Sequence, residues 1–579
     1  MGGRRTRRCR VIRLTDQQQA VVRADGDFLL IACPGSGKTR SAAARVGTTI
    51  ASKRKVAVCS YTNVGANRIA GVIAEMGILL GPEHFVGTLH SFLLRYVVYP
   101  FGRLAGCRQG PHLVEKSSRD VAYLGDHRKR VSVDAFRMRP DGTLVLKSRP
   151  QYLSSIPHMD IVAAVESDVR KHKGSLAQAG YVTFDDAMYL ALAILRKHPT
   201  IANAVAARFD ELLLDEAQDT SELQLACLDE LRSTARLRSL VLVGDLEQSI
   251  FAFQGASAER CRWLADKHGL RTVALTQNHR CSQLICNVAV HFCERDLPDE
   301  AVGPSADCSI EPEVLLYPPD DAVAAVELFR LRLADHGADP ARAAVLGRGN
   351  ALVDELNGDE TPVAVNERPM RLGRAVAALR HDTLTRRQLE QVERIVAYAA
   401  WDEEVLDRVA FDQRERLRTE TIRLLQALPS LDGDLREWIQ RAATLLGDAT
   451  SKLANTPAHP GGRVLTSKAE QIGTTARDLF LPAPRDLKAQ TVHDIKGEDR
   501  DAVMVVIDRP RSSRHGAQAQ LWGSALSGED IDAEQAEEKR IAFVALTRAE
   551  RICVVALPDD QHGRAAAEAF VARGFRLVH

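Results

Sequence analysis

The stretch that decides the fold covers residues 28–39 and reads FLLIACPGSGKT. Its first five residues are apolar and predict a buried strand, and the small residues after them predict a tight turn that opens a helix. Such a turn lets backbone N–H groups close around phosphate oxygens at a helix N-terminus, where the helix dipole also favours an anion. We expect Lys38 to neutralise the β and γ phosphates and the Thr39 hydroxyl to hold Mg²⁺. Ala32 stands where the general pattern has its first glycine, so the match relies on Gly37, Lys38 and Thr39.

The same kind of short apolar run recurs along the chain. Each run is bounded by polar or turn residues and shows no alternation, which is typical of strands buried on both faces of a parallel sheet. The runs lie at 28–32, 56–59, 212–214, 240–243, 343–346, 503–507 and 552–557. Because helical stretches separate them, the sequence predicts an α/β fold.

Two long segments interrupt this regularity. Residues 93–181 are mixed and Arg-rich, whereas residues 362–484 are almost wholly helical in pattern. Each segment is typical of a domain inserted into an α/β core. We therefore expect two lobes, each with an inserted, mainly helical accessory subdomain. The expected first lobe is 1–92 and 182–279 with 93–181 inserted, and the second is 280–361 and 485–579 with 362–484 inserted.

Composition and charge narrow the function classes. With 579 residues, 45% hydrophobic and 26% charged, the chain has an ordinary globular composition. Its 77 Lys and Arg balance 76 Asp and Glu, so the field of the whole molecule does not identify a polyanionic partner. No apolar run approaches the roughly 20 residues of a membrane helix, and residues 1–10 are basic without the apolar region of a signal peptide. We expect a cytoplasmic protein with no membrane partner.

The eleven cysteines, an odd number, do not indicate a disulfide framework. The one loose cluster lacks a CxxC pair, so buried free thiols are favoured over a metal or iron–sulfur site. It consists of Cys281, Cys286, Cys293 and Cys308.

A second strand supplies carboxylates. Residues 211–219 read ELLLDEAQD, and Asp215 ends the apolar run, where it can reach Mg²⁺ through water. Glu216 beside it can orient and deprotonate an attacking water. Acidic residues after a strand are often only a helix N-cap. The phosphate loop upstream favours the catalytic interpretation.

Motifs along nearly the whole chain resemble those of the superfamily 1 helicases of the UvrD/Rep/PcrA type. Besides the phosphate loop and DEAQD, they are LTDQQQAVV at 14–22, SYTN at 60–63, GTLHS at 87–91, TFDD at 183–186, VGDLEQSIFAFQGA at 243–256, NHR at 278–280, residues 346–350, TVHDIKGED at 491–499 and EEKRIAFVALTRA at 537–549. The resemblance implies two RecA-like parallel-sheet lobes.

The resemblance also implies an ATP site with Mg²⁺. Gln18 is in the position that reads adenine, and His279 replaces the tyrosine that packs on it. Gln248 would sense the γ-phosphate, and either Glu498 or Asp499 would bind the ribose. The phosphate-loop residues are Gly35, Ser36, Gly37, Lys38, Thr39 and Arg40.

Phosphoryl transfer is catalysed by positioning and by charge placed where the transition state needs it, so a hydrolase needs arginines opposite the phosphate loop. Arg280 and Arg548 are the candidates, and both lie beyond the first lobe in sequence. If the second lobe carries them, hydrolysis requires the lobes to close. Nucleotide occupancy would then set the gap between two nucleic-acid contacts, which is the geometry of a motor.

Sequence-independent binding of a DNA strand relies on aromatic stacking and backbone charge. The resemblance places Tyr61 and Phe253 against bases, and it places Asn63, His90 and His493 in motifs that line the strand. The expected partner is single-stranded or tailed duplex DNA.

Several positions depart from the family pattern. Phe253 replaces a tryptophan, Gln254 replaces an arginine, and KGEDR at 496–500 replaces the common KGLEF. The last change leaves the ribose ligand open between Glu498 and Asp499. The change at Gln254 bears on the coupling between ATP and DNA.

Two hypotheses of different class follow. The first is an ATP-driven translocase and helicase on single-stranded DNA, with the 3′ to 5′ polarity that the resemblance implies. The second is a helicase-like subunit that senses DNA and controls a partner nuclease, because the KGED variant and short insertions resemble the helicase-like component of the Gabija anti-phage system. The corresponding roles are DNA repair and antiviral defence. A P-loop ATPase acting on protein is disfavoured by the motifs that line the strand.

Overall fold

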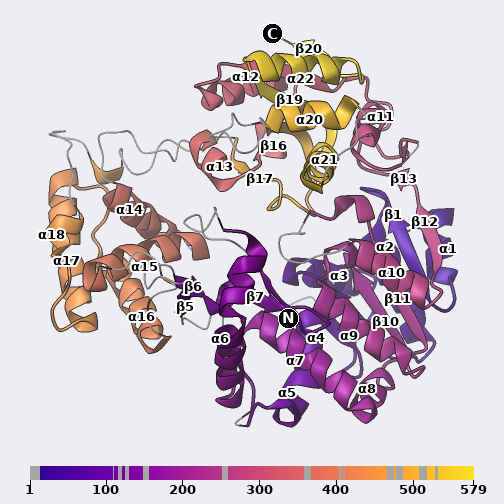
Figure 1. Ribbon diagram of the computed structural model, residues 1–579. Coiled ribbons are helices and arrows are strands. Elements are labelled where there is room, and N and C mark those ends of the chain that lie inside the picture. Colours follow the sequence, from indigo (N-terminus) through magenta and orange to yellow (C-terminus); the bar gives the residue numbers. More distant parts are fainter. Residues whose placement is uncertain are drawn as a thin grey trace, which may run out of the picture.

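The computed structural model describes residues 13–108, 110–114, 120–123, 130–147, 156–250, 258–295, 297–357, 367–381, 383–402, 406, 409, 411–465, 475–477, 487–507, 518–527 and 533–578. Two six-stranded parallel sheets flanked by helices dominate these residues, and a helical segment lies to one side of them (Figure 1). This is the α/β fold that the apolar runs predict, with the two RecA-like lobes that the resemblance implies. Within these ranges, no helix combines the length and apolarity that crossing a membrane requires.

The first sheet has the strand order β12-β1-β11-β10-β2-β3, and all its pairs are parallel. Its strands are β1 (Phe28–Ala32), β2 (Val56–Ser60), β3 (Phe85–Thr88), β10 (Glu211–Asp215), β11 (Ser239–Gly244) and β12 (Arg271–Leu275). The helices around it are α1 (Asp16–Arg23), α2 (Lys38–Ala51), α3 (Asn63–Glu75), α7 (Phe184–Lys197), α8 (Pro199–Ala206), α9 (Glu222–Ser233) and α10 (Ala258–Lys267).

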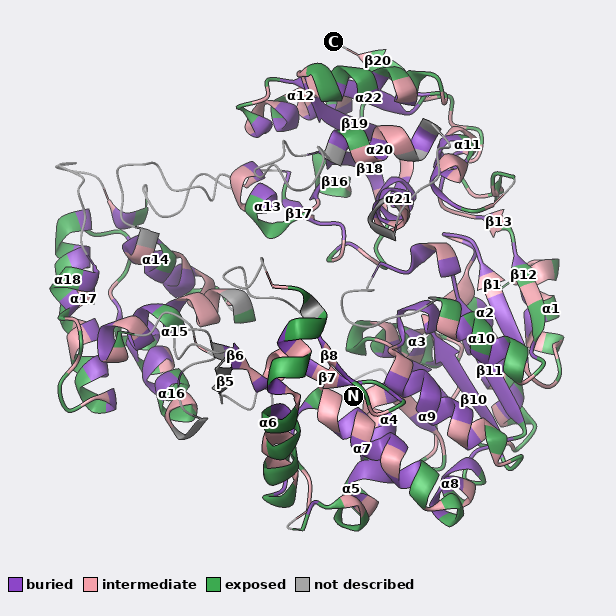
Figure 2. Ribbon diagram, in the orientation of Figure 1, coloured by how far each residue is buried: buried purple, intermediate pink, exposed green. Residues whose placement is uncertain are grey.

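Both faces of this sheet are buried, which explains the unbroken apolar runs. In β10, Leu212 and Leu214 join the apolar core on one face, whereas Leu213 joins the core on the other. The neighbours Leu29 and Leu30 of β1 divide in the same way. Figure 2 shows the central strands of this sheet in the colour of buried residues. Alternate side chains therefore serve two cores, as expected for a parallel sheet covered by helices.

A buried ion pair fixes the helix that follows the phosphate loop against the strand that carries the carboxylates. Arg45 on α2 donates from Nη2 to Glu211 Oε2 at 2.8 Å and from Nε to Oε1 at 3.1 Å. The side chain of Glu211 is fully buried, and Arg45 also lies over the ring of Phe28. The pair thus ties α2 to the amino end of β10.

The segment between β3 and α7 combines one long helix with short strands. Its elements are α4 (Leu89–Leu93), a π-helical turn (Leu94–Val98), α5 (Tyr99–Phe101), β4 (His112–Leu113), β5 (Asp120–Tyr123), β6 (Arg130–Ser132), β7 (Phe136–Met138), β8 (Leu144–Leu146), α6 (His158–Gln178) and β9 (Tyr181–Val182). The antiparallel pairs β5–β6 and β7–β8 differ from the mainly helical subdomain expected here. Their strands have three or four residues, too few to show a period in the sequence.

The second sheet has the strand order β17-β16-β18-β19-β15-β20 and is also parallel throughout. Its strands are β15 (Glu313–Tyr317), β16 (Ala343–Gly347), β17 (Ala489–Thr491), β18 (Arg500–Val506), β19 (Ala549–Pro558) and β20 (Arg576–Val578), and a two-stranded ladder of β13 (Gln277–Asn278) and β14 (Glu300–Ala301) precedes it. Its helices are α11 (Gln283–Ala289), α12 (Ala322–Asp335), α13 (Asn350–Leu356), α20 (Gln518–Ser527), α21 (Ala533–Leu546) and α22 (Gln561–Val571).

The helical segment has an apolar core of its own, and α15 and α17 supply many of its buried side chains. It comprises α14 (Glu367–Arg380), α15 (Arg386–Trp401), α16 (Phe411–Ala427), α17 (Leu435–Leu453) and α18 (Gly461–Val464). In Figure 1 it forms the orange bundle beside the two lobes.

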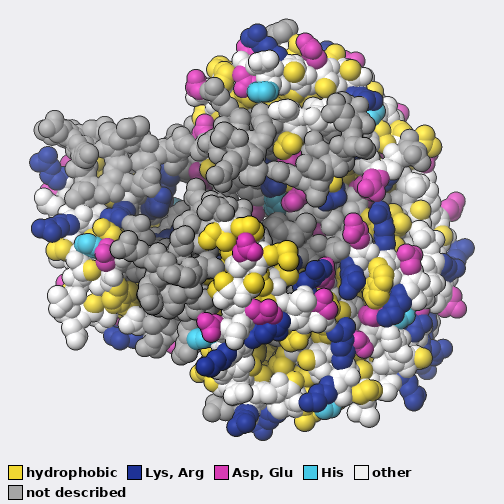
Figure 3. Space-filling view, viewed as in Figure 1, with side chains coloured by type: hydrophobic (Ala, Val, Ile, Leu, Met, Phe, Trp, Pro, Cys, Tyr) yellow, Lys and Arg dark blue, Asp and Glu magenta, His cyan; other side chains and the backbone are white. Residues whose placement is uncertain are grey.

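Charges of both signs are interspersed on the surface. On the face drawn in Figure 3, Lys and Arg side chains alternate with Asp and Glu over the first lobe. This distribution agrees with a formal net charge of +1. Recognition of a charged ligand therefore depends on local groups.

Replacing Arg45 by Ala should loosen the first sheet. The change leaves the Glu211 carboxylate buried and unpaired, so we expect the free energy of local unfolding of β10 to fall by about 3–5 kcal/mol. Hydrogen exchange of the β1 and β10 amides measures it. Arg139→Ala is the matched control because Arg139 pairs with Glu222 at the surface, and its effect should stay within about 1 kcal/mol. Equal effects of the two changes would contradict a structural role of the buried pair.

Candidate active site

A cavity of about 390 Å³ lies between the two lobes. The first lobe contributes the loop between β1 and α2 and the turn after β10, and the second contributes residues that directly precede β18 and β19. The predicted site residues in its lining are Gln18, Gly35, Ser36, Gly37, Lys38, Thr39, Arg40, Glu216, Gln248, His279, Arg280, Asp499 and Arg548. The fold therefore gathers residues from distant parts of the chain around one space.

The phosphate loop requires two glycines. Gly35 and Gly37 have φ angles of 69° and 80°, a left-handed conformation that side chains disfavour. A Cβ atom at Gly37 would lie 2.5 Å from Gln18 Nε2, and one at Gly35 would lie 2.6 Å from Arg280 Cβ. Gln18 Nε2 also donates to the Ser36 carbonyl at 2.9 Å. The loop is thus enclosed closely by α1 and by the second lobe.

The two acidic residues after β10 have opposite electrostatic surroundings. Burial, reinforced by the charge of Glu216, raises the pKa of Asp215. Burial would also raise the pKa of Glu216, but Lys38 and other cations lower it. Lys38 Nζ lies 3.8 Å from Glu216 Oε2, and Gln218 Nε2 donates to the same oxygen at 2.5 Å. Glu216 is therefore held ionised and oriented beside the phosphate loop, as a general base requires.

The residues present fit a divalent cation that is held mainly by phosphate oxygens and water. Asp215 Oδ1 is buried without a hydrogen-bond partner, and Asp215 directly precedes Glu216, which lines the cavity together with Thr39. Such a small set of oxygen donors suits Mg²⁺, which keeps several waters and uses substrate phosphates as ligands. Among the described residues, His, Cys, Asp and Glu side chains form no group of three or more that could hold a metal. Cys281, Cys286, Cys293 and Cys308 are free thiols.

Two arginines face the phosphate loop from the second lobe. Arg280 Nη1 donates to the Thr547 carbonyl at 2.9 Å, and its Nη2 pairs with Asp499. Arg548 is almost fully buried, and its Nη2 donates to Gln248 Oε1 at 3.4 Å. Burial and the neighbouring charge of Arg280 lower the pKa of Arg548 to about 9. An anion placed between these guanidinium groups would offset both the burial of the Arg548 charge and its repulsion from Arg280.

Three buried donors around the cavity have no hydrogen-bond partner: Arg280 Nε, Gln248 Nε2 and His279 Nε2. An unmet buried donor costs about 1–3 kcal/mol, so sites of this kind are normally completed by a ligand. Burial, followed by the charge of Arg40, lowers the pKa of His279, which keeps its ring neutral and suited to packing on a base.

The structure separates the two candidates for the ribose carboxylate. Asp499 lines the cavity, whereas Glu498 is half exposed and pairs with Arg500 at 2.5 Å. The neighbouring Gly497 has a φ angle of 93°, and its carbonyl accepts a hydrogen bond from Arg68 Nη1 of the first lobe at 2.7 Å. The turn thus directs Asp499 inward and Glu498 outward.

The predicted strand-lining residues follow the carboxyl ends of strands in both lobes. Tyr61 and Asn63 follow β2, His90 follows β3, and His493 follows β17. Burial lowers the pKa of His90 to about 4, and the ring of Phe184 lies 5.1 Å from its ring, centroid to centroid. Phe253 and Gln254 lie outside the described residues.

Some residues of this region are not identified by sequence reasoning, although their motifs are. Phe184 belongs to TFDD, is 46% exposed and could stack on a base. Lys496 belongs to KGED, and its Nζ donates to Asp219 Oδ2 at 2.5 Å and to the Gln248 carbonyl at 2.7 Å. Both residues lie in motifs that were matched from the sequence, and their place in these motifs is the signal that could have identified them. The contact of Lys496 with the first lobe can be identified only from the three-dimensional structure.

The protein has two parallel-sheet lobes with a cavity between them that a phosphate loop lines, and comparisons identify similar proteins. Residues 14–268 match the UvrD/REP helicase N-terminal domain. The ATP-dependent DNA helicase UvrD1 of Mycobacterium leprae (strain TN) is 27% identical over 297 residues, which cover 47% of this chain and 38% of the relative. The ATP-dependent DNA helicase PcrA of Staphylococcus aureus (strain NCTC 8325 / PS 47) is 24% identical over 290 residues, 48% of this chain and 39% of the relative.

Residues 14–268 thus match the UvrD/REP helicase N-terminal domain, and about half of the chain is similar to the UvrD1 and PcrA helicases. These matches cover less than two fifths of the length of the relatives. The resemblance identified from the sequence motifs is confirmed.

Replacing Glu216 by Gln should separate binding from turnover. The change removes a base but no phosphate contact, so ATP turnover should fall by about 100-fold or more while ATP binding persists. Steady-state hydrolysis and a nucleotide titration measure the two quantities. Lys38→Ala should abolish turnover, whereas Glu222→Gln, a carboxylate paired with Arg139 away from the cavity, should change neither quantity. Full hydrolysis by Glu216→Gln would contradict the assignment.

Proposed function

We propose that this chain is an ATP-dependent DNA translocase and helicase that hydrolyses ATP between its two lobes and moves 3′ to 5′ along a single strand. The observation that carries the proposal is the cavity, because it places the phosphate loop of the first lobe opposite Arg280 and Arg548 of the second. Hydrolysis in such a cavity depends on how the lobes sit relative to each other. The names of the UvrD1 and PcrA relatives support the same activity.

The proposed roles follow from the contacts. Lys38 neutralises the phosphates, and Glu216 deprotonates the attacking water from its position beside Lys38. Bound Mg²⁺, next to Thr39 and Asp215, would neutralise charge that develops on the phosphates. Arg280 and Arg548 stabilise the charge of the transition state. The unpaired Nε2 of Gln248 is available to the γ-phosphate.

The segment that carries Gln248 supports coupling to DNA. Two residues beyond it, the Ile250 carbonyl lies 3.2 Å from His493 Nε2, and the Ser249 carbonyl accepts a hydrogen bond from Arg540 at 3.0 Å. Both partners belong to the second lobe. A shift of Gln248 toward a phosphate would therefore be transmitted to residues at the proposed strand-binding edge. This linkage is what a translocase needs.

The fold also supports an assignment of domains along the chain. We assign 1–92 and 182–279 to the first lobe and 280–361 and 485–579 to the second. The insertions at 93–181 and 362–484 would engage the duplex junction. The separate apolar cores within the two insertions support this division.

The alternative is a DNA-sensing ATPase subunit that controls a partner nuclease in antiviral defence. The KGED variant at 496–499 supports this alternative, because its Asp499 pairs with Arg280, one of the two arginines that face the phosphate loop. Such a subunit would hydrolyse ATP in response to DNA without moving along it. Movement is therefore the property that separates the two functions.

Replacing Tyr61 by Ala should weaken binding of a single strand. The loss of a stacking surface should cost about 1–3 kcal/mol, while ATP turnover without DNA should survive. Fluorescence anisotropy of a labelled oligonucleotide measures the affinity. Tyr99→Ala, which removes an exposed tyrosine of α5, is the control and should bind DNA normally. Unchanged affinity in Tyr61→Ala would show that this side chain is part of the core.

Strand displacement should depend on a 3′ tail. We expect translocation on single strands. We expect weak unwinding by the isolated chain, because the insertions that would engage the junction are short and Gln254 lacks a charge that could hold the strand. Duplexes with a 3′ tail, a 5′ tail or blunt ends, compared at low and moderate salt, measure it. Robust unwinding from a 5′ tail would overturn the polarity, and DNA-stimulated hydrolysis without movement would favour the sensor.

A further inference from the structure

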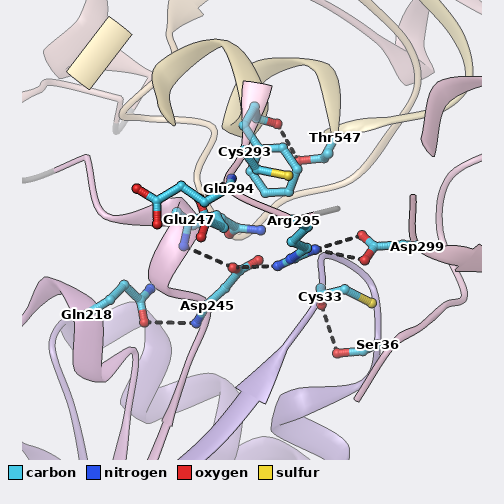
Figure 4. A network of polar contacts seen from close by, with 12 residues as sticks. Cys33, Ser36, Gln218, Asp245, Glu247, Cys293, Glu294, Arg295, Asp299 and Thr547 are labelled. Atoms are coloured by element: carbon cyan, nitrogen blue, oxygen red, sulfur yellow. Dashed lines mark hydrogen bonds and ion pairs between the residues drawn. The ribbon is translucent and has the colours of Figure 1, made fainter. Parts of the chain in front are cut away.

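Arg295 occupies a central position between the two lobes. Its Nη2 donates to Asp245 Oδ1 at 2.8 Å, and its Nη1 donates to Asp299 Oδ1 at 2.8 Å and to Oδ2 at 3.0 Å. Figure 4 shows its guanidinium group between the two carboxylates. Phe292 and Cys293, just before it, pack in the core of the second lobe, whereas Asp245 directly follows β11 of the first. Arg295 therefore connects the two lobes. None of the roles proposed above for ATP hydrolysis involves it.

Asp245 links two functional side chains. Its Oδ1 accepts a hydrogen bond from the Glu247 N–H at 3.2 Å and so caps the short 3-10 helix Leu246–Gln248. Its own N–H donates to Gln218 Oε1 at 3.2 Å, and Gln218 Nε2 donates to Glu216 Oε2. The position of this one carboxylate thus bears on both the sensor Gln248 and the base Glu216.

Arg295 is also connected to the arginine that faces the phosphate loop. Its guanidinium lies over the ring of Phe543, 5.3 Å from the centroid. Phe543 is on α21, and Arg548 follows the end of that helix and donates to Gln248. The contacts close a ring that runs from Arg295 through Asp245 and Gln248 to Arg548 and back through α21.

Two buried carboxylates, those of Asp245 and Asp299, depend on the charge of Arg295. The side chain of Asp245 is fully buried and that of Asp299 is only 10% exposed. Burial raises the pKa of Asp299 to about 6 although Arg295 lowers it. Without the guanidinium, two buried carboxylates would be left close together, and such groups move or take up protons.

We propose that Arg295 is a positioning residue for ATP hydrolysis, which holds the 245–248 segment so that Gln248, Glu216 and Arg548 address the γ-phosphate together. The inference rests on the proposed function. Arg295 lies outside the lining of the cavity and acts through Asp245. It should therefore govern turnover more than nucleotide affinity.

The test compares Arg295→Met, Arg295→Lys and the control Arg262→Met in the full chain. Arg262 forms an exposed pair with Glu294 in the same neighbourhood. We expect kcat with saturating single-stranded DNA to fall at least about tenfold in Arg295→Met, with ATP affinity changed less than about threefold. Arg295→Lys should recover part of the loss because it keeps one ion pair, and Arg262→Met should resemble the unmodified chain.

A double-variant cycle tests the route of the effect. If Arg295 acts through Gln248, Arg295→Met combined with Gln248→Ala should be no slower than Gln248→Ala alone. Hydrogen exchange in the absence of nucleotide gives a second readout, and the amides of Leu246–Gln248 should exchange faster in Arg295→Met. Additive losses of kcat, unchanged exchange, or equal losses of affinity and turnover would each overturn the inference.

Failure of the proposed function is a different result. If the unmodified chain does not hydrolyse ATP with DNA present, the proposed function fails, whatever the exchange data show. If the unmodified chain hydrolyses ATP and Arg295→Met matches it, only the role of Arg295 is refuted.

Discussion

The proposed site depends on one electrostatic constraint: the cations that would stabilise a phosphate come from both sides of a gap between separate lobes. Lys38 comes from the first lobe, and Arg280 and Arg548 come from the second. Each of these cations has a carboxylate nearby, since Lys38 lies near Glu216 and Arg280 pairs with Asp499. A bound triphosphate would exchange these contacts for stronger ones. Binding and relative placement of the lobes are therefore linked by charge.

Further contacts keep the lobes in register beside the cavity. Lys496 reaches Asp219, and Arg540 reaches the Ser249 carbonyl. Arg295 reaches Asp245. In each of these contacts a cation of the second lobe meets an acceptor in the segment that follows β10 or β11 of the first. The acceptors lie close to Glu216 and Gln248 in sequence. The contacts between the lobes and the residues proposed for ATP hydrolysis therefore come from the same short segments.

Local sequence signals predicted most of the fold and much of the site. The runs at 28–32 and 212–214 lie in β1 and β10 because strands buried on both faces show up as continuous apolar sequence. The phosphate loop is equally local. The pairs β5–β6 and β7–β8 could not be predicted, because strands of three or four residues carry no period. Lys496 and Asp219 are 277 residues apart, and only the tertiary structure brings them together.

The choice between Glu498 and Asp499 illustrates the same limit. The two carboxylates are chemically alike and adjacent, so no pattern distinguishes them. The left-handed conformation at Gly497 sets the direction of the following backbone. Side-chain direction in a tight turn is a property of three-dimensional geometry.

The helical bundle α14–α18 keeps its apolar side chains to itself. Its buried residues form one cluster that includes none from either sheet, among the residues that the structure describes. Exchange of the bundle for another of similar size would leave both sheets and the cavity packed as before. The bundle could therefore vary in evolution, or be exchanged by design, while the packing of both sheets is kept.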